Sequence, residues 1–122
     1  MNGNNYLIDS NIIIYVLKGL ANVRPYFESE PFISVITEME ILGMKEITEA
    51  EIKKREAAIE FCSILPFTIS IKNRAILLKR QIKIPLPDAI IAATAIEEGL
   101  TLVTADKGFK RIKDLQLILI EV

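Results

Sequence analysis

The sequence contains no histidine and a single cysteine, and these absences exclude several kinds of functional site. Cys62 has no partner for an internal disulfide, and a zinc site built from cysteine and histidine is excluded as well. There is no histidine to serve as the base for a cysteine nucleophile or a serine triad, and no glycine-rich phosphate-binding loop is present. No histidine-based nucleophile therefore competes with the carboxylates as a source of chemistry.

Long hydrophobic runs are also absent. The apolar runs NIIIYVL and AIIAATAI fall well short of the roughly 20 residues that a membrane span needs. The segment MNGNNYLID lacks the basic region and the apolar stretch of a signal peptide. The chain of 122 residues is long enough for one domain, residues 1–122, with a single core. We therefore expect a soluble, cytoplasmic protein that does not enter a membrane.

The composition has two features that point to partners. Hydrophobic residues make up 51% of the chain, which leaves apolar surface for a dimer interface beyond the core of one protomer. The net charge of −1 hides two basic stretches, residues 72–83 and 107–113, that contain no acidic residue. Such stretches are often solvated helix faces, but they also suit a rim that binds phosphates.

Short apolar segments alternate with helical ones along the whole chain. We expect strands at residues 6–9, 32–35, 67–70, 101–104 and 115–121. We expect helices at residues 10–18, 22–29, from 36 through Gly43, from Thr48 to about Leu65, after Ser70, and at 88–98. This alternation predicts an α/β fold with a mostly parallel sheet. Such sheets bind ligands outside the carboxyl ends of their strands.

Three of the four aspartates are placed where they can meet at that edge of the sheet. Asp9 ends the first expected strand, Asp106 lies two residues beyond the strand at 101–104, and Asp88 opens a helix after the segment IPLP. Each aspartate also has an ordinary explanation, because aspartate commonly caps helices and makes turns. The coincidence of all three at one edge favours a functional site.

The helix after the second expected strand carries two acids, Glu38 and Glu40. Two residues correspond to roughly 200° of rotation around a helix, so both side chains cannot face one cleft. Glu40 shares a face with small neighbours, whereas solvent exposure accounts for Glu38. The geometry therefore favours Glu40 as a fourth site residue.

A cluster of three or four carboxylates repels itself unless a cation is bound, and its pKa values rise in the absence of one. Sites that offer only oxygen ligands suit Mg²⁺ or Mn²⁺. Such an ion activates water and stabilises charge on a phosphate, as phosphodiester hydrolysis requires. The acids therefore indicate metal-dependent chemistry on a phosphodiester.

Four segments carry a family resemblance: YLIDSNIIIY, ISVITEMEILGM, KIPLPDAIIAATAI and LVTADKGFKRI. In this order they resemble the signature segments of PIN-domain ribonucleases, in particular the VapC-type toxins of toxin–antitoxin pairs. The resemblance spans nearly the whole chain. It implies a three-layer α/β/α domain around a central, mostly parallel five-stranded sheet. It also implies Mg²⁺- or Mn²⁺-dependent endoribonuclease activity on RNA, an antitoxin partner and a homodimer.

Carried over by position, the resemblance assigns the catalytic and metal-binding acids to Asp9, Glu40, Asp88 and Asp106. The family often has asparagine at the last of these positions and another acid two or three residues later, where this chain has Gly108 and Phe109. The polar residues expected to orient ligands are Ser10, Asn11 and Thr104, which could equally be helix-capping or turn residues. The residues expected to contact RNA phosphates are Arg74, Lys79, Arg80, Lys107 and Lys110.

Two enzyme classes with an acid after the first strand do not fit the sequence. A haloacid-dehalogenase-like phosphatase needs a second aspartate where Asn11 stands, and a phosphoacceptor receiver domain needs acids that the segment FTIS lacks. The remaining alternative is a PIN-like RNA-binding or scaffolding domain that does not cleave. For the homodimer, we expect partner-facing apolar groups on the early helices, around Ile13, Val16 and Leu20, and an antitoxin tail across the basic rim.

Overall fold

A computed structural model describes residues 5–122. Its centre is a sheet with the strand order β3-β2-β1-β4-β5, in which every pairing is parallel. The strands are β1 (Tyr6–Ile8), β2 (Phe32–Ser34), β3 (Ser63–Leu65), β4 (Thr101–Thr104) and β5 (Gln116–Leu119). The five-stranded parallel sheet expected from the sequence is therefore confirmed.

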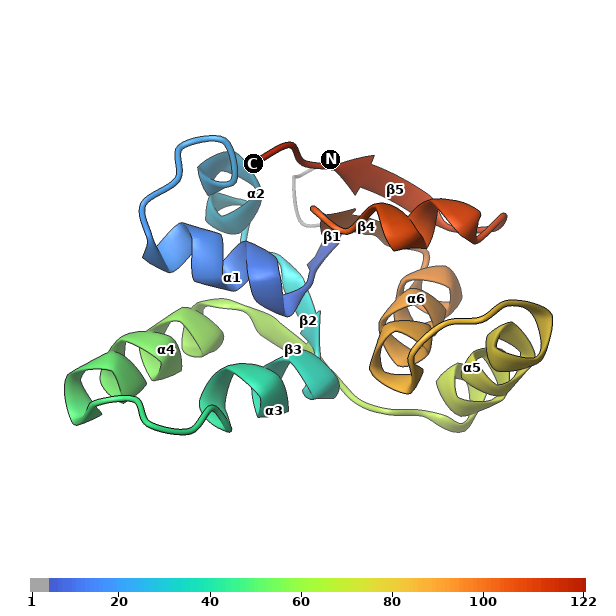
Figure 1. Cartoon of the computed structure of the whole chain (residues 1–122), viewed down its shortest axis with the longest axis horizontal. Coiled ribbons are helices and arrows are strands. Elements are labelled where there is room, and N and C mark those ends of the chain that lie inside the picture. Colours follow the sequence, from blue (N-terminus) through green and yellow to red (C-terminus); the bar gives the residue numbers. More distant parts are fainter. Residues whose placement is uncertain (1–4) are drawn as a thin grey trace.

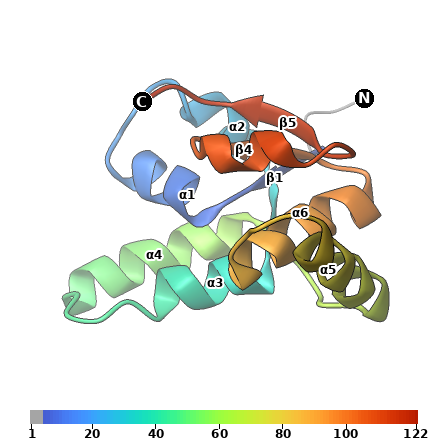
Figure 2. The same ribbon diagram turned by 45° about the vertical axis from the view of Figure 1, so that its right-hand side comes forward.

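Helices cover both faces of the sheet and make a three-layer α/β/α arrangement (Figure 1). The helices are α1 (Ser10–Leu17), α2 (Arg24–Glu28), α3 (Val35–Leu42), α4 (Glu49–Phe61), α5 (Ile69–Gln81), α6 (Leu86–Glu98) and the 3₁₀ helix η1 (Lys107–Arg111). Figure 2 shows α5 packed beside α6, on the opposite side of the molecule from α1. The two helices that flank the switch in strand order, α1 and α6, therefore lie on opposite faces.

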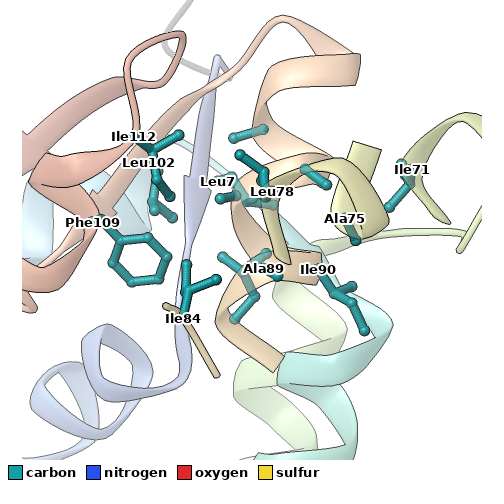
Figure 3. Close-up of a cluster of buried hydrophobic side chains, with 14 of the residues drawn as sticks. Leu7, Ile71, Ala75, Leu78, Ile84, Ala89, Ile90, Leu102, Phe109 and Ile112 are labelled. Atoms are coloured by element: carbon teal, nitrogen blue, oxygen red, sulfur yellow. The ribbon is translucent and has the colours of Figure 1, made fainter. Parts of the chain in front are cut away.

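The alternation of side chains along each strand divides the core into two clusters. Leu7 and Leu102 pack against α5 and α6, and the same cluster contains Phe109 of η1 (Figure 3). The neighbouring residues Ile8 and Val103 point to the other face, where they meet α1, α2, α3 and α4. Both strands are buried on both faces, as is usual for a parallel sheet.

The third strand lies earlier in the chain than the sequence pattern indicated. We expected a strand in FTIS (67–70), but the strand is Ser63–Leu65, which pairs with all of β2. Helix α4 ends at Phe61, and Cys62 is already extended. The segment that follows contains the cap of α5: the Thr68 hydroxyl, and not that of Ser70, accepts the Ile71 N–H at 3.2 Å.

Two further expectations require correction. Helix α6 begins at Leu86, two residues before Asp88, because proline is tolerated in the first helical turn and Pro87 sits there. Ile13 cannot face a partner protomer, since its side chain is completely buried among the residues beneath α1.

No helix in the described part of the chain is long and apolar enough to cross a membrane.

Candidate active site

A pocket of about 330 Å³ opens at the carboxyl edge of the sheet. The four acids assigned from the sequence all line it: Asp9, Glu40, Asp88 and Asp106. Ser10 and Asn11 line it as well. Strand order reverses here, because the chain passes from β1 to β2 on one side and later adds β4 on the other. The pocket therefore occupies the place where parallel α/β sheets bind ligands.

Asp9 follows β1 directly and is buried, with 6% of its surface exposed. Its Oδ1 accepts the Ile12 N–H at 3.2 Å and caps α1. Its Oδ2 accepts the hydroxyl proton of Thr104 at the end of β4. The capping role that aspartate commonly has is thus present, and the same carboxylate also lines the pocket.

Thr104 connects two of the acids. Its hydroxyl donates to Asp9 and accepts the backbone N–H of Asp106 at 3.0 Å. The side chain is fully buried, so water does not compete for these hydrogen bonds. Because β1 and β4 are neighbouring strands, this hydroxyl holds the turn that carries Asp106 against the end of β1.

Glu40 reaches the pocket from α3, where the Ser10 hydroxyl donates to its Oε1. Glu38 does not line the pocket, as the rotation around the helix predicts. The end of α3 is held by the buried guanidinium of Arg55, which donates to the Ile41 carbonyl oxygen at 3.2 Å. A residue of α4 thereby supports the helix end that carries Glu40.

Asp88 and Asp106 complete the acidic edge. Asp88 lies in the first turn of α6, where the positive end of the helix dipole faces it. Asp106 caps η1, with its Oδ1 accepting the Gly108 N–H at 2.8 Å. Gly108 and Phe109 follow it where the resemblance would allow a further acid, so Asp106 is the acid that this loop brings into the pocket.

The electrostatics of the pocket disfavour four ionised carboxylates without a counter-charge. Burial raises the pKa of Asp9 from 3.8 to about 6; the hydrogen bonds from Thr104 and Ile12 oppose the rise, and the charges of Asp106 and Asp88 add to it. Burial also raises the pKa of Asp88, with further contributions from Asp106 and Glu40. Like charges close together in a partly buried site favour either protonation or a bound cation.

The donors suit a hard divalent cation, since carboxylate and hydroxyl oxygens line the pocket and the chain has no histidine. Among residues 5–122, however, no three acidic or thiol side chains are arranged to hold one ion together. In this arrangement the Ser10 hydroxyl donates to Glu40, and the Gly108 N–H donates to Asp106. The residues fit such an ion by charge and ligand type.

Comparison with known proteins identifies the family. The sequence model of the PIN domain matches residues 6–115. The chain belongs to the PIN domain family.

Relatives of this PIN domain are similar over nearly their whole length. Ribonuclease VapC1 of Rickettsia felis is 34% identical over 126 residues, which cover 92% of this chain and 93% of that protein. A chain in a toxin–antitoxin complex from Klebsiella pneumoniae is 30% identical, with a TM-score of 0.78 over 93% of this chain and 95% of that one. A chain in the structure of VapBC-1 from nontypeable Haemophilus influenzae is 28% identical, with a TM-score of 0.71 over 93% and 96%.

The basic residues assigned from the sequence are spread over different surfaces of the PIN domain. Arg74 forms an ion pair with Glu97, at 2.8 Å between Nε and Oε2, and the Lys79 ammonium donates to the Ile84 carbonyl oxygen at 2.7 Å. Lys79 and Arg80 border an apolar groove between α5 and α6. Lys107 and Lys110 are exposed on η1, immediately after Asp106.

Sequence reasoning missed the apolar wall of the pocket. Besides the acids, the pocket is lined by Ile14, Ile41, Met44, Ile91 and Phe109. A helical repeat in the sequence could have indicated some of them, because Ile14 and Ile91 follow Ser10 and Asp88 by three or four residues. The position of Phe109 depends on η1, which the sequence pattern did not predict.

Proposed function

We propose that this chain is a divalent-metal-dependent endoribonuclease and the toxin of a toxin–antitoxin pair. The observation that carries the proposal is the convergence of Asp9, Glu40, Asp88 and Asp106 on one pocket at the carboxyl edge of the sheet. The identity of 34% to Ribonuclease VapC1 supports RNA as the substrate.

The four acids are the residues that would hold Mg²⁺ or Mn²⁺. When bound, such an ion supplies positive charge that stabilises a phosphate in the transition state and activates water as a nucleophile. Thr104 fixes the spacing of Asp9 and Asp106 through its two hydrogen bonds. Ser10 orients Glu40, and Asn11 provides an amide at the rim of the same pocket.

The proposed partners follow from the relatives. The chain that is 30% identical was solved in a toxin–antitoxin complex, which supports an antitoxin protein as a partner of this chain. We also propose a homodimer, because the structure exposes large apolar side chains on several helices, among them Phe61, Ile76 and Leu86.

The variant Asp9→Asn tests the proposed activity. Asparagine is a good helix cap and nearly preserves the shape of the side chain, so the substitution removes the charge and, if the cap to Ile12 is kept, the oxygen that accepts the Thr104 hydroxyl. Loss of a group that only hydrogen-bonds to a metal ligand lowers metal affinity or activity by about 10–100-fold. Because Asp9 is itself a proposed ligand, we expect Mn²⁺-dependent RNA cleavage to fall by at least about 100-fold. Glu60→Gln, at an exposed position of α4, is the matched control and should cleave like the wild type.

The same preparation tests metal binding without relying on cleavage. An ion that binds the folded site better than the unfolded chain raises the melting temperature as its concentration rises. We expect Mn²⁺ to do so for wild type and for Glu60→Gln, and to have little effect on Asp9→Asn. A wild type that binds RNA but does not cleave it with Mg²⁺ or Mn²⁺ would instead support the non-catalytic alternative.

A further inference from the structure

A second cleft lies beside the acidic pocket, between α5 and the segment that follows η1. It encloses about 420 Å³ and is lined by cationic side chains over an apolar floor. The side chains that the argument uses are Arg74, Arg111, Lys113 and Asp114, and we call this site the basic cleft. None of the acids of the catalytic pocket lines it, so the two sites are distinct.

The 3₁₀ helix η1 forms the wall that the two sites share. Phe109 lines the acidic pocket, whereas Ile112, three residues later, lines the basic cleft. Both side chains are anchored in the same hydrophobic cluster, which contains Leu78 of α5 (Figure 3). At a rise of about 2.0 Å per residue, Asp106 and Arg111 are separated by roughly 10 Å along η1.

Arg111 is held in the direction of the acidic pocket. Its Nε donates to the Gly108 carbonyl oxygen at 3.1 Å. A Cβ atom placed on Gly108 would lie 3.1 Å from Asp106 Oδ1 and 4.0 Å from Arg111 Nη2. The guanidinium and the Asp106 carboxylate therefore flank the same glycine, and a side chain at that position would crowd the carboxylate.

The positive charge of the basic cleft is only partly neutralised. Arg74 is paired with Glu97 and lies 3.9 Å from the exposed carboxylate of Asp114. Arg111 and Lys113 are exposed, and neither takes part in a salt bridge within residues 5–122. The fork of terminal guanidinium nitrogens on Arg111 matches the geometry of a phosphate group.

We propose that the basic cleft is a phosphate subsite that holds RNA on one side of the scissile bond, with Arg111 and Lys113 as its ligands. The inference rests on the proposed ribonuclease function. It adds the place at which the RNA strand leaves the acidic pocket. The RNA backbone passes over Gly108, and a phosphate next to the reacting one meets Arg111. Both residues belong to the basic stretch 107–113 that the sequence assigned to phosphates, although the individual residues selected there were Lys107 and Lys110.

The test compares Arg111→Gln/Lys113→Gln with wild type. The control is Arg24→Gln/Lys53→Gln, which removes the same two charges from exposed positions on α2 and α4. Binding of a fluorescent, mixed-sequence single-stranded RNA is measured in chelator between about 50 and 200 mM KCl. A single-strand phosphate contact contributes roughly 0.7 to the slope of log affinity against log salt, so loss of two contacts should reduce the slope by roughly 1.4.

With Mn²⁺ present, we expect the loss in the cleft variant to appear in KM more than in kcat, because the subsite binds substrate away from the reacting phosphate. The control should keep wild-type values of the slope and of KM. A cleft variant that binds and cleaves like wild type would overturn the subsite and leave the ribonuclease function intact. A wild type that neither binds nor cleaves RNA would overturn both.

The same variants distinguish RNA from an acidic protein segment in the cleft. An oligoglutamate peptide serves as the probe for such a segment. If the cleft variant lost affinity for the peptide but kept the RNA affinity and salt slope of wild type, the phosphate subsite would be wrong. If RNA binding alone were weakened, the proposal would be supported.

Discussion

Asp9 both stabilises and destabilises the folded protein: its hydrogen bond caps α1, and its buried charge costs free energy. Its Oδ1 stabilises the start of α1, while the burial of its charge beside Asp106 and Asp88 raises its pKa to about 6. The folded protein therefore binds the Asp9 proton more tightly than the unfolded chain does. An acid that is retained in such a position opposes stability at neutral pH and favours cation binding.

The raised pKa of Asp9 predicts that the free energy of unfolding depends on pH. The unfolded chain releases the Asp9 proton near the usual pKa of 3.8, whereas the folded protein keeps it to about 6, so stability falls as pH rises between these values. A rise of this size corresponds to about 3 kcal/mol. In chelator, we expect Asp9→Asn to gain up to about 3 kcal/mol relative to wild type between pH 4 and pH 7.

Urea unfolding of both proteins at each pH measures this difference. Wild type in saturating Mn²⁺ is the control, because a bound cation removes the penalty on the charged carboxylate. A difference between variant and wild type that stays constant with pH would show that the charge of Asp9 is not destabilising. A variant that is less stable at pH 7 would show that its main role is structural.

At the residue scale, the acids could be predicted from the sequence and their partners could not. Glu40 rather than Glu38 follows from the rotation of a helix, and the pocket contains Glu40. The bond from Thr104 to Asp9 joins residues 95 positions apart, so it depends on the pairing of β1 with β4. Arg111 acquires its orientation from the carbonyl of Gly108, which no spacing in the sequence indicates.

At the element scale, the order and type of most helices and strands could be predicted, and the third strand could not. FTIS and SIL are both short and apolar, and β3 is at the edge of the sheet with largely exposed side chains. An edge strand lacks the buried alternation that marks a strand in sequence. Its position is set by pairing with β2, and Thr68 then has the conformation of a helix cap.

The end of α3 is an element whose geometry depends on one glycine. A Cβ atom on Gly43 would lie 2.6 Å from the Met39 carbonyl oxygen, a backbone atom that cannot move alone. Gly43→Ala therefore has to shift the helix end that carries Glu40. Overpacking of this kind costs about 1–3 kcal/mol, and we expect a loss of that size in urea unfolding.

The shift should also weaken the effect of Mn²⁺ on the melting temperature, because Glu40 moves with the helix end. Lys45→Ala, at an exposed position two residues later, is the control and should behave like wild type. Wild-type stability and metal response in Gly43→Ala would mean that the helix end relaxes without disturbing the site.

At the scale of the whole molecule, the apolar surplus of the sequence appears as exposed surface on particular helices. The early helices contribute less of it than the sequence pattern suggested, because Ile13 is buried and Val16 is half-buried. Between α5 and α6, a groove of about 480 Å³ has an almost entirely apolar lining that includes Phe67, Ile76 and Leu86. Apolar surface of this kind commonly marks a protein interface.

Of these faces, we expect the groove between α5 and α6 to form the proposed homodimer. We expect wild type to sediment as a dimer at micromolar concentration and Ile76→Glu/Leu86→Glu to sediment as a monomer, since a charge in each copy of a two-fold interface leaves both unpaired. Leu17→Glu places one negative charge on the exposed side of α1 and should leave the dimer intact. If Leu17→Glu were a monomer and the α5–α6 variant a dimer, the interface would lie on the early helices. Leu20 and Val16 would then be the expected contacts. A wild type that sediments only as a monomer would exclude a homodimer through either face. The proposed antitoxin would then be the first protein to titrate against the apolar groove.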